Sequence, residues 1–280
     1  MPKRRVTVLV VCLLACLAPA QAQAAAQTET ATSGQVTATF SYVQRHGEFS
    51  DLRLVIQRGG VVALDQRVAS PGCEFACWPG GVVRRKSVRL RDLDGDGEPE
   101  VLLDLFTGGA HCCLVLQVFS LNQPVGDVPS YSRSEHNFLD LGYELVDMDH
   151  EGTPELRSAD GRFAYALSSF AGSAFPIQVW RFQAGALVDV TREFPDLVRA
   201  DSKHHWRRYR KEIRHRAPYN DAGLGALAAW AGDEYLLDHG DRVQRELRSA
   251  LRRGWLNGTF THGRGTVREL NKLLSAAGYR

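Results

Sequence analysis

One nine-residue stretch of this 280-residue chain constrains its fold more than any other. Asp92-Leu93-Asp94-Gly95-Asp96-Gly97-Glu98-Pro99-Glu100 carries a carboxylate at every second position. Carboxylates at this spacing, with glycines that permit positive φ, are typical of a tight loop that surrounds a hard cation with oxygen ligands. The sequence therefore predicts a calcium site, and its candidate ligands are Asp92, Asp94, Asp96, Glu98 (through its carbonyl oxygen) and Glu100.

The stretch does not fit an EF-hand. An EF-hand needs a glutamate at its twelfth position and a helix after the loop. Leu103 stands at the twelfth position, and the apolar run Val101–Phe106 is typical of a β-strand. We therefore expect a calcium loop that opens a strand.

A second copy of this pattern lies 55 residues further on. Its corresponding residues are Asp147, Asp149, Glu151, Thr153 and Glu155. His150 replaces Gly95, so this loop is the weaker candidate and is expected to be less well occupied or empty.

Two shorter echoes follow in the same order. Phe106–Ala110 resembles Phe170–Ala174, and Gln117–Phe119 resembles Gln178–Trp180. Matching segments in a constant order indicate a duplicated unit. The sequence predicts two antiparallel β units, at residues 87–140 and 142–195.

These loops and their flanking strands resemble the FG-GAP and VCBS-type repeats of β-propellers. Such repeats carry a D-x-D-G-D-G loop between two strands and bind calcium at its alternate positions. The resemblance implies calcium as the cofactor and blade-like β units. The stretch Tyr143–Phe194 also looks like exported bacterial proteins of unknown function, which implies no activity. Glu100 departs from the more usual aspartate. Only two copies are visible, whereas a propeller usually has at least four blades.

The first residues have the features of an export signal. Lys3–Arg5 form a positive start, Val6–Leu17 is apolar, and small residues then offer cleavage sites. We predict a signal peptide at residues 1–24 and a flexible tether at 25–34. Leu13-Leu14-Ala15-Cys16 also resembles a bacterial lipobox, in which Cys16 would carry a lipid anchor. The expected location is outside the cytoplasm: periplasmic, at the cell surface or secreted.

Four further cysteines remain: Cys73, Cys77, Cys112 and Cys113. In an exported chain an even number of cysteines indicates disulfides. Cys112 and Cys113 lie in a strand-like stretch and should point to opposite faces. We expect two bridges from the 73–77 loop to this strand. The alternative is a zinc, copper or redox site in which His111 joins the thiolates.

The charge distribution separates two regions. From Gln21 to Pro195 the chain holds 14 basic and 22 acidic residues, whereas from Asp196 to Arg280 it holds 17 basic and 10 acidic residues. Residues 35–195 are rich in strand patterns, including a hairpin around Gly59-Gly60. Residues 196–280 show the apolar spacing of four helices. The predicted fold class is α+β, with a β-rich domain before a small basic helical region.

The first predicted helix carries a dense group of cationic side chains, which could contact an anionic surface. These are Lys203, Arg207, Arg208, Arg210, Lys211 and Arg214. We expect His204 and His205 to lie on the helix surface and not to bind metal.

The sequence contains no nucleophile elbow, zinc-binding H-E-x-x-H or phosphate-binding glycine loop. It favours an exported, calcium-binding, disulfide-stabilised β-repeat protein that serves as a binding or structural module in the cell envelope. Its partner would be a protein or an envelope polymer and not nucleic acid, and only a lipid anchor would attach it to a membrane. One alternative is an envelope hydrolase, which needs a carboxylate pair in a cleft away from the acidic loops. The other is a thiol-based metal or redox protein.

Overall fold

The computed structural model describes residues 25–73, 76–80, 86–109, 112–122, 129–139, 141–215 and 219–280. The predicted signal peptide with Cys16, and His111, lie outside the described residues. None of the helices within these ranges is long and apolar enough to cross a membrane.

The first sheet is an antiparallel meander of four strands. They are β1 (Ala25–Ser33), β2 (Val36–Arg45), β3 (Glu48–Arg58) and β4 (Val61–Arg67). The predicted Gly59-Gly60 hairpin is confirmed, and both glycines have the positive φ that such a turn requires.

The tether predicted at residues 25–34 is wrong, because β1 pairs with β2 along its whole length. The polar composition suggested a linker, but threonine is β-branched and favours strands. Thr30 and Thr32 lie across from Thr39 and Thr37, with hydroxyl oxygens 3.4 and 3.2 Å apart.

Two more antiparallel sheets follow, and each contains one of the acidic loops. The middle sheet consists of β5 (Trp78–Pro79), β6 (Val88–Arg91), β7 (Glu100–Gly109), β8 (Cys112–Leu121) and β9 (Tyr131–Asn137). The third sheet consists of β10 (Glu144–Val146), β11 (Glu155–Ala159), β12 (Ile177–Gln183) and β13 (Ala186–Asp189). In both sheets the acidic loop joins the first two strands of a four-stranded meander, β6–β9 and β10–β13.

The strand registers support the duplication. Val101 pairs with Phe119 in the middle sheet, and Leu156 pairs with Trp180 in the third sheet. The Gln117–Phe119 echo is therefore structural. The Phe106–Ala110 echo is not, because β7 continues to Gly109 whereas β11 ends at Ala159. Phe170–Gly172 instead form a short 3₁₀ turn, η2, in the long β11–β12 connection, which also holds η1 (Gly161–Phe163).

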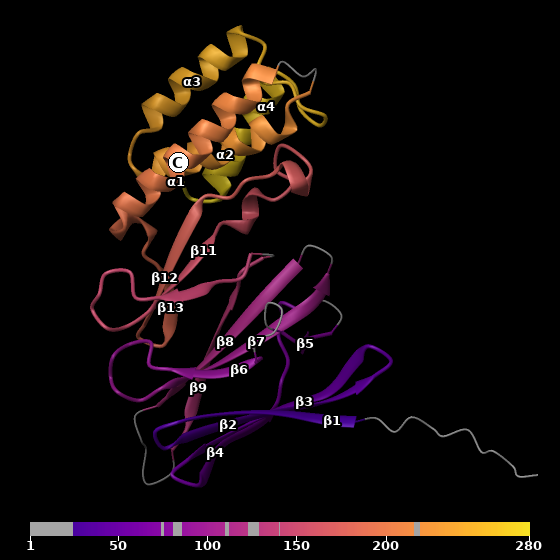
Figure 1. Cartoon of the computed structure of the whole chain (residues 1–280), viewed down its shortest axis with the longest axis vertical. Helices are drawn as coiled ribbons and strands as arrows, with labels where there is room; N and C mark the ends of the chain where they lie inside the picture. Colours follow the sequence, from indigo (N-terminus) through magenta and orange to yellow (C-terminus); the bar gives the residue numbers. More distant parts are fainter. Residues whose placement is uncertain are drawn as a thin grey trace, which may run out of the picture.

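The middle sheet lies between the first and third sheets (Figure 1), and its strand β7 is buried on both faces. Val101, Leu103 and Leu105 of β7 pack with the first sheet, whereas Leu102 packs with the third sheet. Side chains alternate between the faces of a strand, so a strand covered on both sides needs a continuous apolar run. The apolar run Val101–Phe106 is therefore continuous because both faces of β7 are covered.

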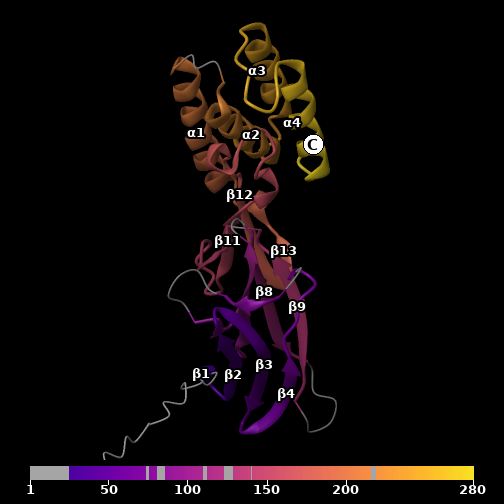
Figure 2. The same ribbon diagram turned by 90° about the vertical axis from the view of Figure 1, so that its right-hand side faces the viewer.

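The C-terminal region is helical, as predicted. Its helices are α1 (Pro195–Glu212), α2 (Asp221–Leu236), α3 (Gly240–Arg252) and α4 (Arg264–Ala276), with the 3₁₀ turns η3 (Thr191–Glu193) before α1 and η4 (Ile213–His215) after it. Trp230 of α2 is fully buried at their centre. Phe163 and Leu167, from the β11–β12 connection, belong to the same core. The helices therefore sit against the third sheet, at the end of the molecule opposite β1–β4 (Figures 1 and 2). The α+β fold class is confirmed.

The expected disulfide pattern is wrong for two of its cysteines. Cys73 and Cys77 bond to each other, with Cα atoms 5.3 Å apart, so neither is bridged to the 112–113 strand. A Cα separation of 5.3 Å is typical of a disulfide. Cys113 is also disulfide-bonded. In this state Cys73 and Cys77 have no thiolate to offer a metal.

Candidate metal centres

The first acidic loop, between β6 and β7, folds around its own carboxylates. Asp92 accepts hydrogen bonds from the Gly95 and Gly97 N–H groups at 2.7 and 3.0 Å. Asp94 accepts one from the Asp96 N–H at 3.3 Å. Gly95 and Gly97 have φ values of +79° and +85°, a conformation that residues with a Cβ adopt at a cost. The sequence pattern thus produces a tight turn with its carboxylates directed inward.

Three of the five predicted ligands come together. Asp92, Asp94 and Glu100 each offer one oxygen, and these atoms lie within 4.8 Å of one another. Glu100 is 3% exposed, and its Oε2 accepts the Leu93 N–H at 2.8 Å. No ion pair joins any of the three to a basic side chain in the described ranges.

The negative charges of this cluster are not neutralised by any basic side chain in the described ranges. Burial, together with the charges of Asp94 and Asp96, raises the pKa of Glu100 to about 8 against the opposing effect of the Leu93 N–H. Partial burial, followed by the charges of Asp96 and Asp92, also raises the pKa of Asp94. A cation placed between these carboxylates would stabilise their charged forms.

The other two predicted ligands lie differently. Asp96 Oδ1 accepts the Glu98 N–H at 2.7 Å, and its carboxylate is not part of the cluster. Glu98 forms a bidentate ion pair with Arg58 at 2.8 and 3.0 Å. Its carboxylate is therefore engaged, which leaves the carbonyl oxygen as its available donor. Arg58 ends β3, so this pair ties the loop to the first sheet.

The second loop, between β10 and β11, repeats three of the first loop's five hydrogen bonds to carboxylates, and Asp147 Oδ1 has no partner in the described part of the chain. Asp147 accepts the Gly152 N–H at 3.1 Å, and Asp149 accepts the Glu151 N–H at 3.2 Å. The fully buried Glu155 accepts the Met148 N–H at 3.0 Å. Oxygens of these three carboxylates also lie within 4.8 Å of one another, whereas Glu151 and Thr153 stay outside the cluster.

The difference between the loops is Arg181, a residue of β12. Its guanidinium lies 2.9 Å from Asp149, 3.0 Å from Glu155 and 2.6 Å from Glu193. Partial burial would raise the pKa of Asp149, but hydrogen bonds from the Glu151 N–H and Glu155, together with the Arg181 charge, hold it below its ordinary value. The second loop thus contains its own cation.

The strand registers make Trp180 equivalent to Phe119. Arg181 and Ser120, the residues that follow them, are therefore equivalent too. Arg181 is not among the site residues predicted from the sequence, although extending the Gln178–Trp180 echo by one residue pairs it with Ser120. A hydroxyl thus stands in the first unit where a guanidinium stands in the second.

The two loops lie side by side. A Cβ at Gly95 would approach the Thr153 Cγ2 atom to 3.0 Å. The acidic loops of adjacent sheets therefore meet at one edge of the stack.

The predicted cationic group divides into two sets. Arg208 reaches the Ser173 carbonyl at 3.5 Å, and Arg210 lies over the Trp206 and Trp255 rings. The remaining four side chains are exposed at spacings that place them on one helix face; they are Lys203, Arg207, Lys211 and Arg214.

The expectation that both histidines lie on the helix surface is wrong for His205. His204 is exposed, but the next residue along α1 faces inward. The Nε2 atom of His205 lies 3.2 Å from the Phe175 carbonyl oxygen, in the segment that leads into β12.

Comparison with known proteins gives two partial relatives. The probable thylakoid lumen protein sll0997 of Synechocystis is 40% identical over 108 residues, which are 38% of this chain and 31% of that protein. The uncharacterized protein y4bJ of Sinorhizobium fredii is 32% identical over 105 residues, which are 37% of this chain and 16% of that protein. The chain thus matches less than a third of either relative's length. No protein-family model and no solved structure matches.

Proposed function

We propose that this chain is an exported β-repeat protein that binds one calcium ion in its first acidic loop and acts as a binding or structural module of the cell envelope. One observation carries the proposal. Asp92, Asp94 and the buried Glu100 present oxygens to a common point and have no ion pair with a basic side chain in the described ranges.

The donor set suits calcium. Calcium takes six to eight oxygen ligands and tolerates irregular geometry. The three carboxylates and the Glu98 carbonyl supply oxygens only, and water would complete the shell. No imidazole or thiolate belongs to this cluster, which argues against zinc or copper.

The position of the loop favours a structural role for the ion. The loop joins β6 to β7, and β7 is buried on both faces. Arg58 attaches the same loop to β3. A bound ion would hold the start of β7 in register and keep the first two sheets together.

Two observations support export. The first 24 residues have the pattern of a signal peptide. One relative is named as a probable thylakoid lumen protein, and the lumen lies outside the cytoplasm. The exposed face of Lys203, Arg207, Lys211 and Arg214 would suit an acidic protein or an anionic envelope polymer as the partner.

Calcium titration by calorimetry tests the proposal. The wild type should bind one calcium ion per chain, and Asp94→Ala should abolish the heat because it removes one of three clustered carboxylates. At a free calcium concentration 100 times Kd, the ion should raise the free energy of unfolding by about 2.7 kcal/mol.

Asp149→Ala is the matched control, because it makes the same change at the equivalent position of the loop that contains Arg181. It should leave the calcium heat of the wild type unchanged. Equal heats for the wild type and Asp94→Ala would overturn the proposal.

A further inference from the structure

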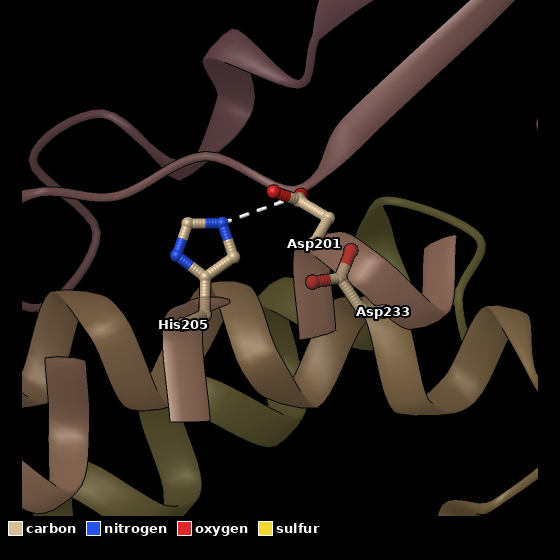
Figure 3. A group of neighbouring side chains, drawn as sticks. All are labelled: Asp201, His205 and Asp233. Carbon is tan, nitrogen blue, oxygen red and sulfur yellow. Dashed lines mark ion pairs between the residues drawn. The ribbon is translucent and has the colours of Figure 1, made fainter. Parts of the chain in front are cut away.

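A second group of ionisable side chains lies between α1 and α2, away from both acidic loops. Asp201 and His205 are one helical turn apart on α1, so they share a face. Asp233 of α2 points toward them (Figure 3). One ligand atom from each residue lies within 4.8 Å of the other two, and His205 Nε2 is 3.3 Å from Asp201 Oδ2.

Asp233 is buried without a hydrogen bond. It is 0% exposed, and neither of its carboxylate oxygens has a partner in the described part of the chain. The nearby Ile177 N–H donates to Asp201 Oδ2, at 2.9 Å. His205 Nδ1 is also buried without a partner, whereas His205 Nε2 faces the Phe175 carbonyl oxygen at 3.2 Å and Asp201. Buried polar groups are almost always satisfied, so the two Asp233 oxygens need an explanation.

The surrounding charges do not compensate Asp233. Burial, together with the charges of Asp201 and Glu234, raises the pKa of Asp233 to about 10 against the opposing effect of the Ile177 N–H. Glu234 is itself engaged by Arg242 at 2.9 Å. No ion pair in the described ranges joins Asp233 to a basic side chain.

The group is accessible from one side. Asp201 lies in the wall of a cavity of about 560 Å³ between the β10–β11 edge and the segment that leads into β12. Phe175 and Ile177 line the same cavity. The Asp201 side chain is 24% exposed, whereas Asp233 lies behind it. An ion entering from the cavity would meet Asp201 first.

We propose that Asp201, His205 and Asp233 form a binding site for a divalent transition-metal ion of the zinc class. One imidazole and two carboxylates suit zinc or cobalt, whereas calcium prefers oxygen ligands only. Metal binding through His205 Nε2 would replace its contact with the Phe175 carbonyl oxygen. The 3.3 Å between this nitrogen and Asp201 Oδ2 equals the separation of about 3.3 Å expected for two ligands of a tetrahedral zinc site.

A bound divalent ion would also neutralise the negative charge of the two carboxylates. Two carboxylates, a neutral imidazole and a divalent ion sum to zero, so the buried group becomes neutral as a whole. Three protein ligands leave a fourth position open toward the cavity, where water or a small oxygen ligand binds.

Cobalt titration of the full chain tests the site. The protein is stripped with a chelator and saturated with calcium, so that the first acidic loop does not contribute. Cobalt binding is then followed by calorimetry and by the visible absorption of the ion. The expected result is one cobalt ion per chain with nitrogen and oxygen ligation, displaced by zinc.

Two variants and one control assign the ligands. Asp233→Asn and His205→Gln should each weaken cobalt binding by at least about tenfold, the lower end of what even outer-shell partners of metal ligands cost. His204→Gln changes the exposed neighbouring imidazole and should bind cobalt as the wild type does. The apo form of Asp233→Asn should melt at or above the wild-type temperature, which separates lost binding from misfolding.

Three results would overturn the proposal: no cobalt binding by the folded wild type, unchanged affinity in Asp233→Asn and His205→Gln, or an equal loss in His204→Gln. The Asp94→Ala variant should bind cobalt normally, so failure of the calcium proposal and failure of this one are distinguishable.

Discussion

The two acidic loops share three backbone hydrogen bonds to their carboxylates but have opposite electrostatic environments. Glu100 is buried without a basic partner in the described ranges, whereas Glu155 is paired with Arg181. The pKa of Asp94 is raised, while that of the equivalent Asp149 is lowered. A loop's acidic pattern therefore does not decide whether it needs an external cation. A single residue on a neighbouring strand decides it.

The largest expected effect comes from Arg181→Ser. This substitution gives the second unit a serine at the position where the first unit has Ser120. In the absence of calcium this variant should lose about 3 kcal/mol of stability, because it leaves the buried Glu155 without its cation. Calcium should restore the stability, and calorimetry should then count two ions per chain. A destabilised variant that still binds a single calcium ion would refute the idea that Arg181 replaces the ion.

Matched glutamine substitutions should change stability in opposite directions. Glu100→Gln keeps the acceptor for the Leu93 N–H but removes a charge that the folded state disfavours. With a chelator at pH 7, it should be more stable than the wild type by about 2 kcal/mol. Glu155→Gln removes the partner of Arg181 and should cost about 1–2 kcal/mol.

The stabilisation by Glu100→Gln should depend on pH. The folded-state pKa of Glu100, about 8, lies above the ordinary value of 4.5, so ion-free wild type loses stability as the pH rises between these values. The advantage of glutamine should therefore be absent below pH 4.5 and grow above it. Urea denaturation at several pH values measures this, and a pH-independent difference would contradict the assignment.

The smallest effect concerns the glycine that differs between the loops. Gly95→Ala should cost about 1–2 kcal/mol, because φ is +79° and the new Cβ would lie 3.0 Å from Thr153. His150→Gly at the equivalent position should change stability by less than about 0.5 kcal/mol. There the relief of a positive φ of 62° is offset by the greater backbone entropy of glycine when unfolded. Thermal melts of both variants compare them directly.

The local sequence patterns were the most reliable predictors. The hairpin at Gly59-Gly60, the strand after Glu100 and the four C-terminal helices follow from turn residues and apolar spacing, which act over a few residues. The tether at 25–34 failed because a polar strand and a polar linker have similar compositions. The disulfide expectation failed because the path of the chain around Cys73 and Cys77 is not encoded in residue spacing.

The candidate sites were predictable only where their residues are close in sequence. Asp92, Asp94 and Glu100 lie within nine residues, so the loop itself brings them together. Arg181 reaches the second loop from a strand 32 residues beyond Asp149. Asp233 reaches His205 only through the packing of two helices.

The sequence by itself determined the acidic loops, their duplication and the change from strands to helices, because these depend on neighbouring residues. The tertiary structure alone decided which loop lacks an internal cation and where an imidazole meets two buried carboxylates. Charges interact through space, and burial sets the cost of leaving them uncompensated. Both quantities depend on which distant segments the fold places beside one another.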